Sequence, residues 1–235
     1  MLQNLRFEGG LALPVKTREI HNHHMDSTRW NGFPFRDDDI VIATWAKSGT
    51  TWTQQIVAQL IFDGAEGIDV PTLSPWVDMR IVPQEAIDAL ELQTHRRFLK
   101  THLPVDALTF SPKAKYIYVA RDGRDAAWSA YNHFVKAKEE FYEAFNAVPG
   151  RVGPPIHRPT GTALDYYREW FAGDGAPLWS FWENIRTWWE IRHLPNVMLL
   201  HFNELKRDLP GSVRRIAAFL DLPVSEARLP LILHH

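Results

Sequence analysis

Cysteine is missing from all 235 residues of this chain, and so is any long uninterrupted apolar run. Without cysteine the chain cannot form disulfides or thiolate metal sites, which is consistent with a reducing compartment. No run approaches the roughly 18 apolar residues that a membrane-crossing helix needs, and residues 1–6 lack the apolar core of a signal peptide. These absences predict a soluble, cytoplasmic protein.

The chain also lacks a marked excess of charge. Lys and Arg number 26 against 28 Asp and Glu, which gives a formal net charge of -2. This balance gives no electrostatic reason to expect nucleic acid or a membrane as a partner, so an anion site must come from a local cluster of cations. A hydrophobic content of 45% in 235 residues is enough for a substantial core. We therefore expect one α/β domain over residues 1–235.

The clearest signal of function is a strand–turn–helix pattern between residues 40 and 61. The β-branched run 40–44 predicts a buried strand, and Val57, Leu60 and Ile61 recur at the spacing of one helix face. The turn between strand and helix directs unpaired backbone N–H groups and the positive end of the helix dipole at one point. A doubly charged phosphate is the natural occupant of such a point.

Side chains of this turn strengthen the predicted anion site. Lys47 contributes a positive charge, Gly49 lets the backbone approach a ligand closely, and hydroxyl groups follow from Ser48, Thr50 and Thr51. An ordinary strand-to-helix turn with a solvated lysine is the alternative interpretation.

The seven residues Ala46–Trp52 resemble the 5′-phosphosulfate loop of cytosolic-type sulfotransferases, which reads Pro-Lys-Ser-Gly-Thr-Thr-Trp. Six of the seven positions match, and Ala46 stands where the family usually has proline. The loop does not fit Gly-x-x-x-x-Gly-Lys-Ser/Thr, the pattern that cradles nucleoside triphosphates.

A second motif, Lys100 to Pro104, follows the apolar pair Phe98 and Leu99, which predicts a short buried strand. In an extended chain Lys100 and His102 point to the same side. A neighbouring cation keeps a histidine neutral at pH 7, which is what a general base for a hydroxyl requires. Lys-Thr-His-Leu-Pro also resembles the sulfotransferase family, which implies that His102 is the catalytic base. A structural histidine at a strand end is the alternative.

A third motif places Arg121 at the end of an apolar run, Tyr116–Ala120, where open α/β sheets bind ligands. Asp122 is a suitable N-cap for a helix that continues through Ser129. Arginine grips phosphate with two parallel hydrogen bonds. The segment resembles the family pattern Tyr-Val-Ala-Arg-Asn-x-x-Asp-x-x-x-Ser, which implies that Arg121 and Ser129 bind a 3′-phosphate. Asp122 departs from the usual Asn and is harmless if it only caps the helix.

Two segments carry little periodicity. Residues 1–38 are expected to form an irregular N-terminal segment, and we interpret its cluster of His21, His23 and His24 as a solvated turn rather than a metal site. Residues 136–178 mix charge with proline and glycine and predict a long lid or excursion, which is usually functional or mobile in a compact domain.

Two further groups of aromatic and apolar residues admit a core or a site interpretation. Trp76, Val77 and Met79 fall in a loop region that lines the acceptor pocket in the resembling family, and each is equally suited to the core. A helix is expected over 179–193, with a stripe that we interpret as core: Leu178, Trp182, Ile185 and Trp189. The resemblance also implies an altered adenine contact at Trp182.

The resemblance covers roughly residues 39–222 and implies a single α/β domain with a central parallel sheet. It implies transfer of a sulfuryl group from 3′-phosphoadenylyl sulfate to the hydroxyl or amine of a small molecule, with a phenol or alcohol expected. Adenosine 3′,5′-bisphosphate is the second product, and no metal is expected. The implied catalytic residues are His102, Lys47 and Lys100. The implied donor-binding residues are Lys47, Ser48, Gly49, Thr50, Thr51, Trp52, Arg121, Ser129 and Trp182.

Two other functions remain open at this stage. The family's Ser/Thr-x-Phe and Arg-Lys-Gly-x-x-Gly segments have no match up to His235, so a non-catalytic module that binds adenosine bisphosphate is one alternative. A P-loop kinase is the other, although the glycine spacing is wrong and no metal-binding Asp is evident. The sequence does not predict the acceptor's identity, the oligomeric state or the role of the 136–178 segment.

Overall fold

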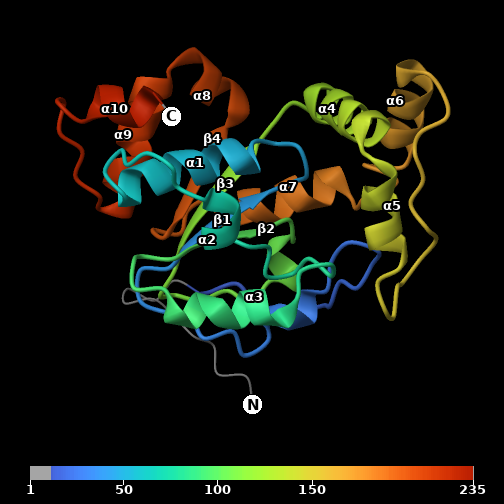
Figure 1. Ribbon diagram of the computed structural model, residues 1–235, viewed down its shortest axis with the longest axis horizontal. Coiled ribbons are helices and arrows are strands. Elements are labelled where there is room, and N and C mark those ends of the chain that lie inside the picture. The colour runs from blue at the N-terminus through green and yellow to red at the C-terminus, as the bar shows by residue number, and fades with distance from the viewer. Residues whose placement is uncertain (1–11, 235) are drawn as a thin grey trace.

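A computed structural model describes residues 12–234 of the chain and places a four-stranded parallel sheet at their centre. The strands lie in the order β2-β1-β3-β4. Their bounds are β1 (Ile40–Thr44), β2 (Phe98–Thr101), β3 (Lys115–Ala120) and β4 (Val197–His201). Helices flank this sheet (Figure 1). The predicted α/β class with a central parallel sheet is confirmed, as are the three predicted strands.

The helices differ in length and position around the sheet. In chain order they are η1 (Ser27–Trp30), α1 (Thr50–Ile61), α2 (Val70–Leu73), α3 (Gln84–Asp88), η2 (Ala89–Leu92), η3 (Val105–Ala107), α4 (Gly123–Lys136), α5 (Glu139–Asn146), α6 (Ala163–Ala172), α7 (Phe181–Glu190), α8 (Phe202–Arg207), α9 (Leu209–Leu220) and α10 (Leu229–His234). Helices α8, α9 and α10 lie at the opposite end of the molecule from α4, α5 and α6 (Figure 1).

Both faces of the sheet are buried, as parallel sheets require. Successive strand residues point to opposite faces, so Val41 and Ala43 pack on one side with the buried Trp188, while Ile40 and Ile42 pack on the other against α1 and α9. The near-continuous apolar run of β1 therefore reflects its place in the middle of the sheet.

The strand order positions three loops at one edge. Strand β1 pairs with β2 on one side and with β3 on the other, and Thr101 and Val119 lie in register with Ala43 and Thr44. The chain therefore reverses its direction of travel across the sheet between β2 and β3, which is where open α/β sheets bind ligands. The segments after β1, β2 and β3 open together at this edge.

A buried ion pair joins the start of β1 to the start of β2. Arg97 donates hydrogen bonds from Nε and Nη2 to the Asp39 carboxylate, at 2.8 and 2.5 Å, and each side chain is only 1% exposed. The two hydrogen bonds fix both partners in one geometry. The pair aligns the first residues of the two strands that end at the site.

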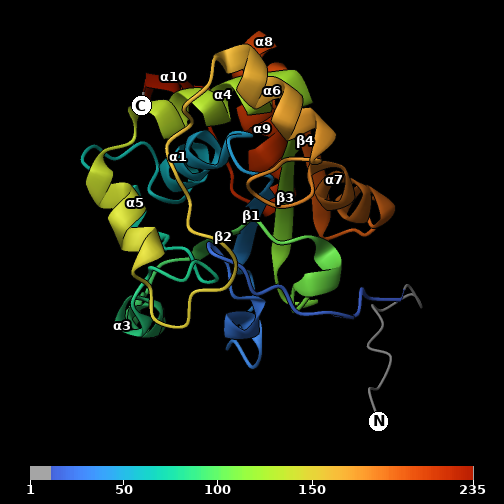
Figure 2. The same ribbon diagram turned by 90° about the vertical axis from the view of Figure 1, so that its right-hand side faces the viewer.

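Residues 136–178 contain helices α5 and α6, joined by coil over 147–162. Figure 2 shows this coil running along the same face of the molecule as α4, α5 and α6. Arg80 holds the coil by donating to the carbonyl oxygens of Pro149 and Gly150 at 2.9 and 2.7 Å.

Among residues 12–234, no helix has both the length and the apolar character needed to cross a bilayer. Residues 1–6, which bear on a signal peptide, lie outside the described range.

The predicted helix near residue 180 exists as α7. Leu178 and Ile185 of the predicted stripe pack against the core, but Trp182 and Trp189 do not. Trp182 and Trp189 are 54% and 56% exposed, while Phe181, Asn184 and Trp188 are buried. The reason is that polar groups of the buried face bind the segment after β2. The Trp188 indole, for example, donates to the Leu103 carbonyl oxygen at 3.1 Å.

Candidate active site

A cavity of about 590 Å³ opens at the carboxyl edge of the sheet. Most of the residues that the sequence nominated line it: Lys47, Gly49, Thr50, Thr51, Trp52, His102, Arg121 and Ser129. These residues come from the segments after β1, β2 and β3, so the fold brings the three motifs to one place. Ser48, Lys100 and Trp182 do not belong to the lining.

The loop after β1 has the backbone of an anion site. Lys47 and Gly49 both have left-handed conformations, with φ of 63° and 113°, and Gly49 precedes α1 without a side-chain cap. The first amides of α1 are therefore not bonded by a capping side chain. A Cβ at Gly49 would lie 2.9 Å from the Phe202 ring, so only glycine fits there. The Ser48 hydroxyl is buried without a hydrogen-bond partner.

Two cations of the site lack a counter-ion. No carboxylate of the described residues pairs with Lys47 or Arg121 within 4.0 Å. Arg121 donates to the Lys47 carbonyl oxygen at 2.7 Å and lies 4.2 Å from the centroid of the Phe202 ring, while its Nε is buried and unpartnered. Burial lowers the pKa of Lys47, and the Arg121 charge lowers it further. Such a pair favours binding of an anion.

Asp122, which departs from the family pattern, is engaged away from this pair. Its carboxylate accepts from the Arg124 backbone N–H at 2.8 Å and caps α4. The Arg124 side chain pairs with the same carboxylate at 2.7 Å, and these hydrogen bonds lower the pKa of Asp122 to about 2. Asp122 therefore serves as the predicted cap, and its charge is matched by Arg124.

His102 has a defined tautomer. Its Nδ1 lies 2.7 Å from the carbonyl oxygen of Thr44. A carbonyl oxygen can only accept, so we assign the proton to Nδ1, which leaves Nε2 with a free lone pair. Burial is the main cause that lowers the pKa of His102 to about 3; the hydrogen bond to Thr44 opposes it, and the charges of Lys100 and Lys47 add to it. The imidazole is neutral at pH 7 and able to accept a proton.

Aromatic and amide contacts hold the His102 residue from both sides. The ring centroids of Trp76 and Trp179 lie 4.3 and 5.3 Å from that of His102. Asn184 on α7 donates to the His102 carbonyl oxygen at 2.8 Å and accepts from the Tyr118 hydroxyl at 2.8 Å. The side chain and the backbone of His102 are thus both constrained.

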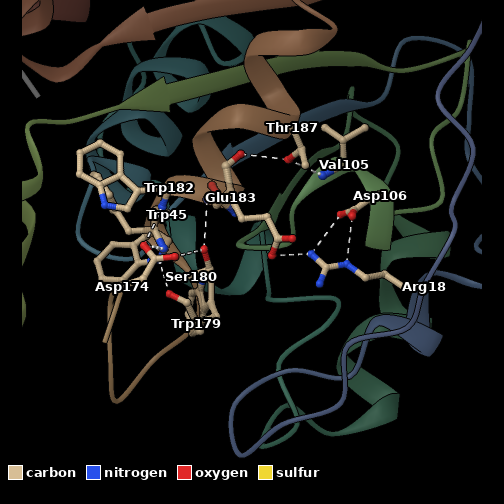
Figure 3. Close-up of polar contacts among 12 residues, drawn as sticks. Arg18, Trp45, Val105, Asp106, Asp174, Trp179, Ser180, Trp182, Glu183 and Thr187 are labelled. Atoms are coloured by element: carbon tan, nitrogen blue, oxygen red, sulfur yellow. Dashed lines mark hydrogen bonds and ion pairs between the residues drawn. The ribbon is translucent and has the colours of Figure 1, made fainter. Parts of the chain in front are cut away.

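The turn before α7 fixes the position of Trp179, as Figure 3 shows. The Trp45 indole donates to the Trp179 carbonyl oxygen at 3.0 Å. Asp174 accepts from the Trp182 backbone N–H at 3.0 Å and from the hydroxyl of Ser180, which is the N-cap of α7. The turn thereby holds an indole that lines the cavity.

A second set of contacts in Figure 3 joins α7 to segments far away in the sequence. Arg18 forms ion pairs with Glu183 at 2.7 Å and with Asp106 at 3.0 Å. The Val105 N–H donates to the Thr187 hydroxyl at 3.2 Å. These contacts tie the N-terminal segment and the residues after His102 to one helix.

Lys100 lies beside the cavity wall rather than on it. Its ammonium is 4.8 Å from the centroid of the Trp76 ring and donates to Gln54 Oε1 at 3.5 Å. Burial lowers the pKa of Lys100 to about 8, although the Asp78 charge opposes this shift. Lys100 is therefore placed to act on His102 through its electric field, with the Trp76 indole next to both.

Trp52 and Trp182 have different surroundings. Trp52 lines the cavity, and its ring meets that of Phe202 edge-on at 5.5 Å. Trp182 lines a neighbouring surface hollow of about 340 Å³, to which Arg121 also contributes. Arg121 thus borders both spaces.

The rest of the cavity wall is mainly apolar, and sequence reasoning found only part of it. Trp76 and Met79 line the cavity as expected, whereas Val77 is fully buried in the core. Several lining residues were not nominated as part of a site: His24, Ile81, Val82, His133, Phe202 and Trp179. Among residues 12–234, no group of three or more His, Cys, Asp or Glu has the arrangement of a metal site.

In the histidine cluster near the N-terminus, His21 is exposed as predicted, but His23 and His24 are not solvated. His23 and His24 are 8% and 6% exposed. The reason is that the segment pairs with residues around Met79, through an antiparallel bridge from Met25 and a hydrogen bond from the Arg80 N–H to the His24 carbonyl oxygen at 2.9 Å. A long-range pairing buries these side chains.

The family follows from comparison with known proteins. Residues 37–235 match the family described as "Sulfotransferase domain". The chain belongs to this sulfotransferase family, whose reaction is the transfer of a sulfuryl group to an acceptor.

Relatives with similar sequences align with almost the whole chain. The glycolipid sulfotransferase of Mycobacterium bovis (strain BCG / Pasteur 1173P2) is 35% identical, over 92% of this chain and 73% of the relative. Sulfotransferase 1B1 of Mus musculus is 32% identical, over 92% of this chain and 69% of the relative.

Solved structures show the same fold. Mouse sulfotransferase SULT7A1 complexed with PAP, adenosine 3′,5′-bisphosphate, superimposes with a TM-score of 0.64 at 21% identity, over 87% of this chain and 66% of that chain. Retinol dehydratase in complex with retinol and PAP superimposes with a TM-score of 0.67 at 23% identity, over 88% and 67%. The chain spans about two thirds of the length of these solved chains. The expected family and reaction class are thereby confirmed, as is a small-molecule acceptor.

Proposed function

We propose that this chain transfers the sulfuryl group of 3′-phosphoadenylyl sulfate to the hydroxyl of an apolar phenol or alcohol, with His102 as general base. The observation that carries this proposal is the hydrogen bond from His102 Nδ1 to the Thr44 carbonyl oxygen. It leaves Nε2 unprotonated on a residue that lines the same cavity as Lys47 and Arg121. A base and an anion site thus share one space.

The residues present fit the bisphosphate part of the donor. The buried, unpartnered Ser48 Oγ and Arg121 Nε need hydrogen-bond partners, and phosphate oxygens supply acceptors for both. Lys47 and the amides of residues 48–51 would hold the 5′-phosphate. Arg121 and Ser129 would hold the 3′-phosphate. Trp52 would stack on adenine, with a weaker contact from Trp182.

The chain's own residues divide the reaction between them. When bound, the donor supplies the sulfuryl group and leaves as adenosine 3′,5′-bisphosphate. His102 Nε2 takes the proton of the acceptor hydroxyl while that oxygen forms a bond to sulfur and the bond between sulfur and the 5′-phosphate oxygen breaks. Lys47 and the loop amides stabilise the negative charge that grows on the departing oxygen, and Lys100 adds positive potential. Positioning and charge stabilisation are sufficient for such a transfer.

The apolar wall supports an acceptor with an apolar body. The lining includes Trp76, Met79, Phe141, Phe145 and Trp179. Relatives are named for glycolipid and luciferin, and one structural neighbour contains retinol. We take a hydroxyl on a ring or alkyl body as the acceptor class.

We also propose that residues 136–178 act as a lid over the acceptor end of a single domain. Phe141 and Phe145 from this segment line the cavity, and Arg80 holds its coil at Pro149 and Gly150.

The cytoplasmic location remains a prediction from composition.

The test combines turnover and binding. The protein is incubated with 3′-phosphoadenylyl sulfate and a panel of phenols, alcohols and amines, and bisphosphate release and the sulfated product are measured. Turnover by the wild type but not by His102→Ala is expected. Bisphosphate binding without turnover of any acceptor would favour a non-catalytic binding module. Thermal stabilisation by ATP–Mg²⁺ but not by adenosine 3′,5′-bisphosphate would favour a kinase.

A further inference from the structure

His24 lines the same cavity as His102, but the mechanism above does not use it. The side chain is only 6% exposed, and its Nδ1 is buried without any hydrogen-bond partner. Its Nε2 also forms no hydrogen bond with a described residue, and it is not among the fully buried atoms, so Nε2 is the nitrogen that a ligand in the cavity can reach. A buried polar atom without a partner costs stability, and such atoms are uncommon in folded proteins. An unpartnered imidazole on a cavity wall therefore points to a ligand group that completes it.

Ring contacts place His24 in the acceptor half of the cavity. Its ring centroid lies 4.4 Å from that of Phe145 on α5 and 6.0 Å from that of Trp179. The Trp179 ring in turn lies 5.3 Å from His102. Both imidazoles thus contact one indole, so a molecule of one or two rings is long enough to meet both of them.

The backbone presents His24 in a fixed orientation. The side chain of Asn22 accepts hydrogen bonds from the N–H groups of His24 and Met25, both at 2.8 Å. The His24 carbonyl oxygen accepts from the Arg80 N–H at 2.9 Å, and Met25 forms an antiparallel bridge with Met79. The imidazole is therefore held in place before a ligand arrives, which lowers the entropy cost of binding.

The group offered by His24 is a neutral one. Burial lowers the pKa of His24 to about 3, and the charges of His23, His102 and His133 lower it further. A neutral imidazole carries one donor nitrogen and one acceptor nitrogen. It therefore suits a hydroxyl or a carbonyl better than an anion.

We propose that His24 binds a second polar group of the acceptor, a hydroxyl or carbonyl at the far end of an apolar body whose other hydroxyl reacts at His102. This inference rests on the proposed function and names the acceptor class more narrowly: a rigid, ring-containing molecule with polar groups at both ends. A site that hydrogen-bonds a substrate hydroxyl discriminates against an analogue that lacks it, because the buried nitrogen is then left unpaired.

The neighbouring His23 provides a matched control. Its ring centroid lies 4.4 Å from that of His24, it is 8% exposed, and its Nε2 is also buried without a partner. It does not line the cavity. Replacing either histidine by phenylalanine removes one buried imidazole, and only one of the two replacements changes the cavity wall.

The experiment compares two near-isosteric probes, 4-phenylphenol and 4,4′-dihydroxybiphenyl, by calorimetric titration with and without adenosine 3′,5′-bisphosphate. The wild type is expected to bind the diol about tenfold more tightly, beyond the factor of two for its equivalent hydroxyls. His24→Phe should abolish this preference, and His24→Gln, which keeps a donor and an acceptor near the Nε2 position, should restore part of it. His23→Phe should keep the full preference.

Several outcomes would overturn the proposal. These are equal affinity of the wild type for the two probes, an unchanged preference in His24→Phe, the same loss in His23→Phe, or no binding of either probe. Turnover is measured separately with 3′-phosphoadenylyl sulfate. A diol preference that depends on His24 in a protein without sulfuryl transfer would refute the proposed function and leave the assignment of His24 intact. Normal sulfuryl transfer without the diol preference would refute the assignment of His24 and leave the proposed function intact.

Discussion

Nδ1 of His102 lies 2.7 Å from the carbonyl oxygen of Thr44, so the residue after β2 is bonded to the last residue of β1. The Thr44 hydroxyl lies 3.2 Å from the same nitrogen and 2.6 Å from the hydroxyl of Thr50, the first residue of α1. One threonine therefore sets the tautomer of the base and also contacts the phosphate loop. The relative position of base and anion site depends on this residue.

The first prediction concerns the base. His102→Ala should lower kcat by about 100- to 10,000-fold, which is the contribution that a positioned general base typically makes. The affinity for adenosine 3′,5′-bisphosphate, measured by calorimetry, should stay within about twofold, since His102 does not belong to the phosphate loop. A variant with near-normal turnover would refute the assigned role.

The second prediction concerns pH. His102 must be neutral to act, and its pKa is lowered to about 3. We therefore expect kcat/KM to persist well below pH 6.5 and to fall only as the pH approaches 3. Lys100 contributes its charge below its pKa of about 8, so kcat/KM should decline as pH rises through that value. An aliphatic alcohol is the suitable acceptor, because its own hydroxyl does not titrate in this range.

The matched variant for the pH profile is Lys100→Arg. Arginine stays charged throughout, so the decline near pH 8 should move upward by more than one unit. An acidic limb close to pH 6.5 in the wild type, or an alkaline limb that Lys100→Arg leaves in place, would contradict these assignments.

The third prediction concerns donor binding. Arg121→Ala should weaken the binding of adenosine 3′,5′-bisphosphate by roughly 10- to 100-fold, because hydrogen bonds to charged groups contribute about 1.5–3 kcal/mol. Arg124→Ala is the control, since the Arg124 side chain is 77% exposed and pairs with Asp122. Calorimetric titration of both variants checks this. Equal losses in the two variants would mean that general positive charge, rather than Arg121 itself, holds the phosphate.

The fourth prediction concerns the pair Asp39–Arg97. Arg97→Ala should lower the free energy of unfolding by about 3–5 kcal/mol, because it leaves a buried carboxylate without its partner. The surface pair Arg214–Glu226 serves as control, and Arg214→Ala should cost at most about 1 kcal/mol. Urea denaturation measures both. Similar losses of stability in the two variants would show that burial of the Asp39–Arg97 pair does not increase its contribution to the free energy of unfolding.

The fifth prediction concerns Asp78, which is fully buried and accepts hydrogen bonds from the Trp30 indole and the Thr101 hydroxyl. Burial raises the pKa of Asp78 to about 6, above the ordinary 3.8. The folded chain therefore binds more protons between these values, and its stability falls as pH rises through them. A shift of this size corresponds to about 3 kcal/mol.

Asp78→Asn removes that titration and keeps an oxygen that accepts hydrogen bonds. Unfolding free energies of the wild type and Asp78→Asn, measured by urea titration at pH 4 and pH 7, should differ in their pH dependence by about this amount. Parallel curves for the two proteins would show that Asp78 does not titrate in this window.

The parts of the site that the sequence predicted are those coded by contiguous residues. The phosphate loop, His102 and Arg121 each follow a buried strand directly, and parallel pairing in register brings those strand ends together. Local sequence was sufficient because the chemistry lies within a few residues of each strand end.

The parts that the sequence missed depend on contacts between distant segments. Trp182 and Trp189 share an apolar helical spacing with buried positions, but Asn184 and Trp188 bind the segment after β2 and decide which face is buried. His24 looked solvated because nothing in its own stretch predicts the pairing of Met25 with Met79. Periodicity and composition report on neighbours in the chain, and they do not report on these partners.

The left-handed backbone of Lys47 has a practical consequence for dissecting this enzyme. A non-glycine residue with φ of 63° costs energy that glycine does not. Lys47→Gly therefore removes the ammonium group while the backbone through Ser48 and Gly49 can keep its conformation without strain. Lys47→Val would remove the charge and also shift the backbone. Any measured difference between these two substitutions would report how much the loop's shape matters apart from its electrostatics.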